Sequence, residues 1–217
     1  MINKIVDTNT AISKIKDGMT VMIGGFACCG CAHRLIDALS KSNVKDLTLI
    51  STDASKEDKD IVKLFLAKKV KKMIVSHMGL NKEANRQMVA GECEIELIPM
   101  GTLVERIRCA GVGLGGFLTN VGIGTVAQEG KQVINLNGRD YIIEEPLKAD
   151  VALISATLAD EYGNLFYKGT SRNSNPIMAM AADIVIAESP KICKIGEIEK
   201  ECIHTAGIFV DYIVRSD

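Results

Sequence analysis

The stretch "TVMIGGFACCGCAHRLIDALSKS" (residues 20–42) decides the fold of this chain. Its opening, "TVMIGG" (20–25), is typical of a buried strand that runs into a glycine turn. Residues 32–42 then carry leucine and isoleucine at helical spacing, which predicts a helix directly after the turn. A strand, a glycine loop and a helix in this order form the opening unit of an α/β fold.

The glycines of this loop suggest a binding site for an anion. A loop that follows a strand and opens a helix presents backbone N–H groups at the positive end of that helix. Gly24, Gly25 and Gly30 would allow the backbone to approach a phosphate or a carboxylate closely. An ordinary tight turn explains the same glycines equally well, so the loop alone leaves both interpretations open.

The same alternation of apolar runs and amphipathic stretches continues along the chain. It predicts strands at residues 46–51, 72–77, 95–99, 150–156 and 183–189, and helices at residues 58–69, 81–92, 101–111 and 175–182. Residues 133–143 are expected to form a hairpin centred on Asn137-Gly138, because Asn-Gly is a strong hairpin-turn signal. We therefore predict an α/β protein with an open, largely parallel β-sheet flanked by helices, a β-hairpin insertion in the second half, and one domain over residues 1–217.

The composition argues against several classes of protein. The 217 residues carry 26 basic and 27 acidic side chains, so no strongly basic surface for nucleic acid is expected. The basic run "AKKVKK" (67–72) is interpreted as a solvated helix end. The apolar stretches have the length of strands and not of membrane spans, and the N-terminus lacks the apolar core of a signal peptide. Seven scattered cysteines do not suit a secreted disulfide framework, which indicates a cytoplasmic protein with reduced thiols.

Three of the cysteines lie in or next to the glycine loop: Cys28, Cys29 and Cys31. Cys28 and Cys31 have the C-x-x-C spacing of redox motifs. A structural zinc site, however, pairs two such units, and the other cysteines and the histidines are scattered along the chain. We therefore expect these thiols to pack a tight loop, and we predict no metal site.

A second glycine cluster, "AGVGLGGFLT" (110–119), formally matches G-x-G-x-x-G between Gly111 and Gly116. A dinucleotide-binding loop follows a strand, whereas this cluster follows a predicted helix. A sharply turning loop and a ligand contact explain these glycines equally well.

Polar side chains follow several predicted strands. Thr52 and Asp53 follow one strand, His77 follows the next, and Met100-Gly101 follow the third. Because ligands gather at the carboxyl edge of an open parallel sheet, these are candidate pocket residues.

The segment "GTSRNSNP" (169–176) adds further polar groups. Arg172, Asn173 and Asn175 are suited either to holding a carboxylate or to capping the next helix, and for Asn175 the capping role is sufficient. No nucleophile for covalent catalysis is recognisable, since G-x-S-x-G, P-loop and H-E-x-x-H motifs are absent. The glutamates lie mostly in amphipathic stretches that suit a solvated surface, as for Glu57, Glu83, Glu92, Glu94 and Glu129.

Together these motifs resemble the α subunits of class I coenzyme A-transferases. "DGMTVMIGGFACCG" (17–30) is similar to the first signature of that family and lies near the N-terminus, where the family has it. The likeness continues in "MGTLVERIRCAGVGLGGFLT" (100–119), "EEPLKADVALI" (144–154) and "RNSNP" (172–176), and so covers nearly the whole chain. The chain looks like the α subunit of a two-subunit 3-oxoacid or short-chain acyl CoA-transferase, such as acetate or butyrate–acetoacetate CoA-transferase.

The resemblance implies an enzyme that moves CoA from an acyl-CoA to a free carboxylate. In this family a glutamate of the β subunit attacks the thioester, and a glutamyl-CoA thioester is the intermediate of a ping-pong exchange. The α chain then needs no nucleophile of its own. CoA and acyl-CoA are substrates, no tightly bound cofactor is implied, and the expected assembly is an α/β hetero-oligomer of two chains of each kind or larger.

The resemblance also assigns roles to particular residues. The loop that binds CoA comprises Gly24, Gly25, Phe26, Ala27, Cys28, Cys29 and Gly30. The pocket for the acyl group and the carboxylate is bordered by Thr52, Asp53, Met100, Gly101, Gly115, Gly116 and Phe117.

Several positions depart from the family pattern: Ala32, Thr52, Met100, Ser174 and Ala206. Met100 stands where the family has a glutamine whose amide can hydrogen-bond a substrate oxygen, so we expect a different preference among acids. The departures also leave open a regulatory module that binds CoA or a nucleotide without catalysis. An isomerase of sugar phosphates on a related sheet would need its own acid/base pair in the second half, and none is recognisable there.

Overall fold

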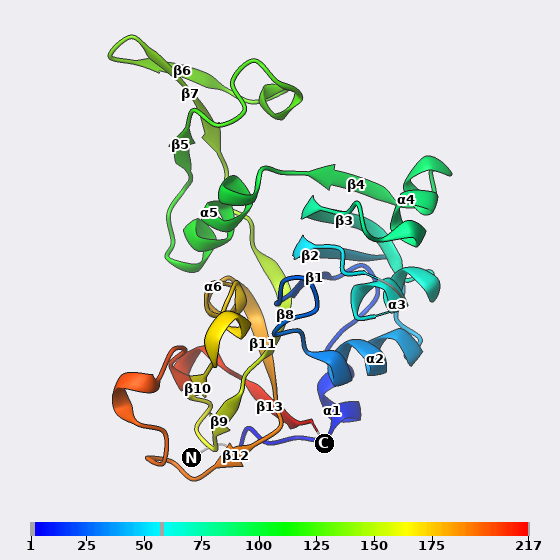
Figure 1. Ribbon diagram of the computed structural model, residues 1–217, viewed down its shortest axis with the longest axis vertical. Coiled ribbons are helices and arrows are strands. Elements are labelled where there is room, and N and C mark those ends of the chain that lie inside the picture. Colours follow the sequence, from blue (N-terminus) through cyan, green and yellow to red (C-terminus); the bar gives the residue numbers. More distant parts are fainter. Residues whose placement is uncertain (1–2, 57–58, 217) are drawn as a thin grey trace.

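The computed structural model describes residues 3–56 and 59–216, and its centre is a parallel β-sheet (Figure 1). In spatial order the strands are β13 (Tyr212–Arg215), β11 (Ala182–Ser189), β8 (Ala149–Ser155), β1 (Thr20–Ile23), β2 (Leu47–Asp53), β3 (Val70–His77) and β4 (Glu94–Leu97). β1 lies in the middle, where Val21 pairs with Leu49 of β2 and with Val151 of β8. The predicted open parallel sheet is confirmed. Because the strands are parallel, their carboxyl ends meet at one edge.

Helices cover both faces of the sheet (Figure 1). One face is covered by α1 (Thr8–Ile12), α2 (His33–Lys41), α3 (Ile61–Leu66) and α4 (Lys82–Val89). The other face is covered by α5 (Met100–Gly111) and α6 (Asn175–Met180). Side chains alternate along each strand, so Val21 and Ile23 of β1 pack toward α2 while Met22 packs toward α5 and α6. The aliphatic core thus has two layers with the sheet between them.

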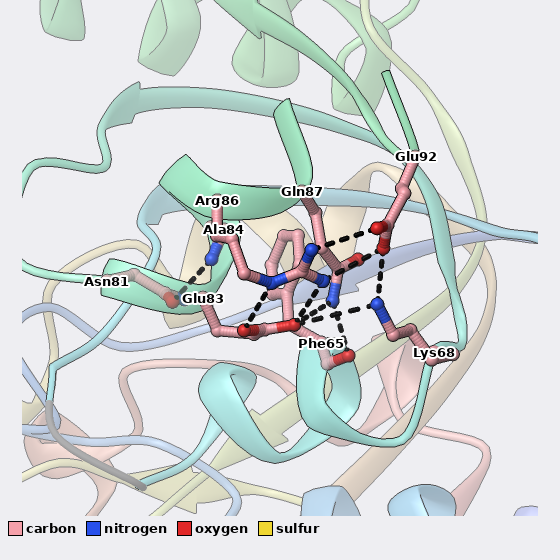
Figure 2. A network of polar contacts seen from close by, with 8 residues as sticks. All are labelled: Phe65, Lys68, Asn81, Glu83, Ala84, Arg86, Gln87 and Glu92. Atoms are coloured by element: carbon pink, nitrogen blue, oxygen red, sulfur yellow. Dashed lines mark hydrogen bonds and ion pairs between the residues drawn. The ribbon is translucent and has the colours of Figure 1, made fainter. Parts of the chain in front are cut away.

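A network of charges joins α3 to α4 (Figure 2). Arg86 bonds the carboxylates of Glu83 and Glu92, each at 2.8 Å, and Lys68 pairs with Glu92 as well. These cations lower the pKa of each carboxyl to about 2. Lys69 is buried and donates to two backbone carbonyl groups. The basic run that contains these two lysines does follow a helix end, but it is not the freely solvated face that we expected.

A small sheet packs beside α6 on the same side of the main sheet. It consists of β9 (Leu158–Asp160), β10 (Leu165–Phe166) and β12 (Ile192–Cys193). Short 3-10 helices occur in the connections: η1 (Val126–Gln128), η2 (Gly169–Ser171), η3 (Lys200–Cys202) and η4 (Gly207–Phe209). Ala159 and Leu165 of the small sheet join the core layer under α5 and α6, which anchors the second half of the chain.

Another small sheet stands away from the body, beyond α5 and β4, and we call residues 117–144 the arm (Figure 1). Its antiparallel strands are β5 (Phe117–Thr119), β6 (Val133–Leu136) and β7 (Arg139–Glu144). The predicted hairpin is confirmed, with φ of 53° at Asn137 and 80° at Gly138, as a type I′ turn requires. β5 was not expected, because its residues directly follow the second glycine cluster and pair only with distant β7.

Candidate functional site

The loop between β1 and α2 forms a tight turn at the carboxyl edge of the sheet. Phe26 and Cys29 exchange backbone hydrogen bonds of 3.0 and 2.8 Å across it. The two residues between them have left-handed backbone angles, with φ of 48° at Ala27 and 67° at Cys28. Such angles cost conformational energy in residues that carry a Cβ. The surrounding structure must therefore hold the loop in place.

The glycines of this loop lie where neighbouring atoms leave no room for a side chain. A Cβ on Gly24 would lie 1.9 Å from Oδ1 of Asn175, and one on Gly30 would lie 2.5 Å from the carbonyl oxygen of Ser171. Gly25 has a φ of +115°, which residues with a side chain rarely adopt. Close packing therefore explains these glycines without a ligand.

Asn173, in the segment before α6, braces the loop from one side. Its Oδ1 accepts from the N–H of Gly25 (3.1 Å), and its Nδ2 donates to the carbonyl groups of Cys29 and Thr170 (3.0 Å each). Both ends of the amide are engaged, so Asn173 is not free to hold a substrate carboxylate as we expected. Arg172 beside it is exposed.

Asn175 ties the loop to the sheet and is fully buried. Its Nδ2 donates to the carbonyl groups of Gly30 (3.0 Å) and Ser171 (2.9 Å), and its Oδ1 accepts from the N–H of Ser155 at the end of β8 (3.2 Å). The capping role expected for Asn175 is wrong, because Ser174 is the N-cap residue and the Asn175 side chain points into the loop. Asn175 is a structural centre of the site.

The end of β2 supports the opposite side of the loop. The hydroxyl of Thr52 donates to the carbonyl of Gly25 (2.7 Å), and Oδ2 of Asp53 accepts from the N–H of Ala27 (2.9 Å). Burial raises the pKa of Asp53, although the hydrogen bond from Ala27 opposes this shift. His77 is the partner of Asp53 in the register of β2 and β3. The structure thus brings Thr52 and Asp53 to the glycine loop.

The start of α2 is occupied by a buried carboxylate. Glu188, at the end of β11, accepts from the N–H of Leu35 in the first turn of the helix (2.9 Å). Burial raises the pKa of Glu188, and the N–H groups of Leu35 and Arg34 oppose the shift. The N–H group of Leu35 at the helix start is therefore already bonded to a carboxylate of this chain and is not available to an outside anion. The sequence signal that could have revealed Glu188 is its place at the end of an apolar strand.

A surface cavity of about 520 Å³ lies beside the loop and is lined by Phe26, Ala27, Cys29, Thr170 and Asn173. The thiol of Cys29 is exposed and lies 3.5 Å from Oγ1 of Thr170. Burial raises the pKa of the Cys28 and Cys31 thiols, so neither forms a reactive thiolate readily. Among the described residues, no three His, Cys, Asp or Glu side chains are grouped so that they could hold a metal ion.

The remaining predicted pocket residues are Met100, Gly101, Gly115, Gly116 and Phe117. The first two begin α5 after β4, Gly115 and Gly116 connect α5 to the arm, and Phe117 is the first residue of β5. A Cβ on Gly115 would meet open space, whereas one on Gly116 would lie 2.6 Å from the carbonyl oxygen of Glu144. Within residues 3–56 and 59–216, no hydrogen bond or ion pair joins this group to the Gly24–Gly30 loop. Of the predicted pocket residues, Thr52 and Asp53 are thus the ones that hydrogen-bond the loop.

Neither of the buried glutamates in the described residues is free to attack a thioester. Glu188 binds the start of α2, and Glu144 of β7 pairs with Lys131 at 2.6 Å. Four of the glutamates expected at the surface are indeed not buried: Glu83, Glu92, Glu94 and Glu129. The fifth, Glu57, lies outside the described residues. The site offers a rigid loop and a cavity for a ligand, but no free glutamate nucleophile.

Within the part of the chain that the structure describes, none of the helices combines the length and apolar character needed to cross a membrane.

Comparisons with known proteins agree with the resemblance in the sequence. The chain is 45% identical to the acetate CoA-transferase subunit alpha of Escherichia coli (strain K12) over 216 residues, which cover 100% of this chain and 98% of that subunit. It is 48% identical to the acetoacetyl-CoA:acetate/butyrate CoA transferase alpha subunit of Clostridium acetobutylicum over 215 residues, 99% of each chain.

Among solved structures, an acyl-CoA transferase from Escherichia coli O157:H7, in a thioester complex with CoA, has a TM-score of 0.90 at 20% identity. The match covers 99% of this chain and 47% of that one, so this chain spans about half of that protein's length. At this identity the likeness shows a common fold. The family profile described as coenzyme A transferase matches residues 5–216, and the chain therefore belongs to the coenzyme A transferase family.

Proposed function

We propose that this chain is the α subunit of a short-chain acyl CoA-transferase, which moves CoA between an acyl-CoA and a free carboxylic acid. The observation that carries the proposal is the identity of 45–48% to two α subunits over essentially full length. The absence of a free buried glutamate among the described residues supports a nucleophile on another chain. The enzyme then works as a cytoplasmic hetero-oligomer of two α and two β subunits or larger.

The proposed chemistry is a ping-pong exchange. A glutamate of the β subunit attacks the thioester carbonyl, the carbon–sulfur bond breaks, and an acyl-glutamyl anhydride and the CoA thiolate form. The thiolate attacks the glutamyl carbonyl, which releases the first acid and leaves a glutamyl-CoA thioester. The acceptor carboxylate attacks the glutamyl-CoA thioester and displaces the CoA thiolate, which gives a new anhydride. The thiolate then attacks the acyl carbonyl of this anhydride, so that the new acyl-CoA forms and the glutamate carboxylate is released. CoA enters and leaves as substrate, and no tightly bound cofactor takes part.

The α chain contributes binding and orientation to this exchange. The Gly24–Gly30 loop and the cavity beside it would hold the CoA side of the substrate, in a position that Asn173, Asn175 and Asp53 make rigid. A loop that is rigid before binding loses little conformational entropy when substrate arrives. The acyl group and the acceptor carboxylate would lie between the β-subunit glutamate and the predicted pocket residues at the ends of β2, β4 and α5.

The test is to assay this chain alone, the β chain of the same organism alone, and the purified complex. The assay follows CoA transfer from acetyl-CoA or butyryl-CoA to acetoacetate. We expect activity only from the complex, and mass spectrometry of the complex after addition of acyl-CoA should find CoA on a glutamate of the β chain. Activity of this chain alone would contradict the proposed division of labour. A verified complex that is inactive with all short acyl donors would favour the regulatory module.

Met100 supports a preference for an acid other than acetoacetate. Its side chain is partly exposed at the start of α5 and offers neither the donor nor the acceptor of a glutamine amide. We expect Met100→Gln to raise kcat/KM for acetoacetate relative to acids without a second carbonyl oxygen. An unchanged ranking of acids would show that Met100 does not line the acid pocket.

A further inference from the structure

The arm has two faces, and the chain itself covers one of them. In the sheet register Phe117 pairs with Glu144 and Val133 pairs with Ile142, which places these residues on one face. Ile142 is fully buried there, because the connection from β5 to β6 folds over it: a Cβ on Gly122 would lie 3.7 Å from the Ile142 side chain. This covered face supplies the small core of the arm.

The opposite face, which we call the open face, consists of Leu118, Ile134, Leu136, Tyr141 and Ile143. The register pairs Leu118 with Ile143 and Ile134 with Tyr141, so these side chains form one continuous apolar strip. None of them is buried, and Leu118 and Leu136 are 40% and 45% exposed. The guanidinium group of Arg139, opposite Leu136, lies 5.7 Å from the Tyr141 ring at one end of the strip.

Exposed apolar surface is concentrated in this part of the molecule. Of the 18 exposed large apolar side chains among the described residues, 7 fall between residues 112 and 136, and 2 of these, Leu118 and Leu136, lie on the open face. Single exposed apolar residues are ordinary on a protein surface, whereas the five apolar side chains that share the open face form the kind of strip that another molecule covers.

The arm is fixed to the body, so its exposure does not come from a loose segment. Arg106 of α5 donates to the carbonyl of Glu145 (2.8 Å) and its own carbonyl accepts from Leu147 (2.9 Å). Glu144 is buried, and its carboxylate lies 3.8 Å from Nε of Arg106 in α5. A small sheet whose only fully buried apolar side chain among the described residues is Ile142 gains little stability alone. A rigid arm with an uncovered apolar face is suited to packing against a partner.

We infer that the open face of the arm is part of the docking surface for the β subunit, an inference that rests on the proposed function. The predicted pocket residues Gly115–Phe117 lead directly into β5, and Leu118 of the open face is the next residue. A β chain whose glutamate reaches that pocket must therefore lie against the end of the arm nearest the body, where Phe117 pairs with Glu144 and which we call the root of the arm. The open face continues the same surface outward and gives the β chain an apolar contact.

The fold of a related protein favours the β chain over a second copy of this chain. This chain matches 47% of the acyl-CoA transferase from Escherichia coli O157:H7, so that protein carries a further half on the same polypeptide. The two relatives named alpha subunits are matched over 98% and 99% of their length, so they carry no such further half, and we infer that a β chain supplies it. Five side chains make only part of a stable interface, which typically has about 20–30 residues a side.

A photo-crosslinking experiment identifies the occupant. p-Benzoyl-phenylalanine in place of Leu136, in this chain purified with the β chain of the same organism, is expected to crosslink to the β chain on irradiation. The same group in place of Leu66, which is 53% exposed on α3, serves as the control and should give no crosslink. A crosslink between two copies of this chain, or none in a complex that assembles, would overturn the inference.

Binding of a matched pair of variants gives an independent measurement. Leu136→Glu places a carboxylate opposite Arg139, which keeps the hairpin folded while it removes the apolar contact. We expect this variant to bind the β chain at least about tenfold more weakly than the wild type, whereas Leu66→Glu binds normally. Circular dichroism and thermal melting of the free variants confirm that both fold. Unchanged binding of Leu136→Glu would overturn the inference.

Failure of this inference and failure of the proposed function give different results. A complex that crosslinks through Leu136 but transfers no CoA to any acid contradicts the proposed function and leaves the docking surface in place. An active complex in which Leu136→Glu binds normally contradicts the docking surface alone. If the wild-type chain does not bind the β chain, the docking surface is also wrong.

Discussion

The two glycine-rich regions of this chain have similar composition, but every glycine of the first is tightly packed, whereas the second also contains glycines in open space. In the Gly24–Gly30 loop, a Cβ on any of the glycines would lie within 2.5 Å of another atom. In the cluster before the arm, a Cβ on Gly113 or Gly115 would meet nothing within 4 Å, whereas one on Gly111 or Gly116 would lie 2.7 or 2.6 Å from another atom. The first region is braced from several sides, whereas the second leads to a surface that its own chain leaves open.

This difference separates two physical reasons for glycine. In the loop, distant residues such as Asn175 occupy the space that a side chain would need, so glycine is required by tertiary packing. Before the arm, Gly113 turns the backbone at a φ of +74° in open space. Added side-chain volume in the loop should therefore lower the free energy of unfolding strongly. Added volume at Gly113 or Gly115 should instead affect the binding of partners and substrates.

The largest effect is expected from Gly24→Ala. The new Cβ would lie 1.9 Å from Oδ1 and 2.8 Å from Cγ of a side chain that hydrogen bonds hold in place. Overpacking and the loss of these bonds should reduce the free energy of unfolding by about 3 kcal/mol or more. Urea unfolding followed by circular dichroism measures this. A loss below about 1 kcal/mol would show that the loop yields easily, and the contrast between the regions would fail.

Asn175→Ala should be the next most harmful change. It removes the partner of the Gly30 and Ser171 carbonyl groups and of the Ser155 N–H, and we expect a loss of about 2–3 kcal/mol. The same change removes the atoms that collide with a Cβ at Gly24. The double variant should therefore lose clearly less than the sum of the two single losses. Strict additivity would contradict the steric explanation.

The sheet was predictable from local pattern, because each of its central strands is a short apolar run beside a turn or an amphipathic helix. The hairpin was predictable for a similar reason, since Asn137-Gly138 suits the left-handed angles that a type I′ turn needs. β13 (Tyr212–Arg215) was missed because four residues after an irregular stretch carry little signal, and pairing with β11 makes them a strand.

The details of the site depend on contacts between residues far apart in sequence, which local pattern does not contain. Glu188 reaches the N–H of Leu35 across 153 positions, and Asn175 reaches the carbonyl of Gly30 across 145. A glycine that only packing requires looks the same in sequence as one that a phosphate requires. The resemblance therefore indicated the correct family, while the physical reason offered for the loop was incomplete.

The free energy of unfolding should depend on pH through Asp53, which supports the loop. Burial raises the pKa of Asp53 in the folded chain, so the folded state keeps a proton that the unfolded state releases above pH about 4. Its contribution to stability is then present at low pH and is lost as the pH rises through the folded pKa. Asp53→Asn should cost about 1–2 kcal/mol at pH 4 and less at pH 7. Urea unfolding of both proteins at each pH gives the difference, and a cost that grows with pH would reverse the assignment.

In the arm, Glu144→Gln should loosen the root with little effect on the body. The change removes the ion pairs of the buried carboxylate with Lys131 (2.6 Å) and with Arg106 of α5 (3.8 Å), and the partly exposed Lys131 can turn to solvent. We expect the free energy of local opening of the arm to fall by about 1 kcal/mol, with global unfolding unchanged. Hydrogen exchange of β5 to β7 measures the first quantity and urea unfolding the second. A global loss as large as that of Asn175→Ala would mean that the arm and the body unfold as one unit.

Gly115→Ala should have the smallest effect on stability and is the sharpest test of the contrast. Its Cβ would meet open space and its φ lies outside the left-handed region, so the free energy of unfolding should change by less than about 0.5 kcal/mol. If Gly115 borders the acyl pocket of the assembled enzyme, the added methyl group should nevertheless raise KM for the larger acyl substrates, with a smaller change for acetyl-CoA. The stability of the free chain and the kinetics of the complex are measured side by side. Unchanged kinetics with every acyl-CoA would remove Gly115 from the pocket, and a large loss of stability would show that this region is packed like the loop.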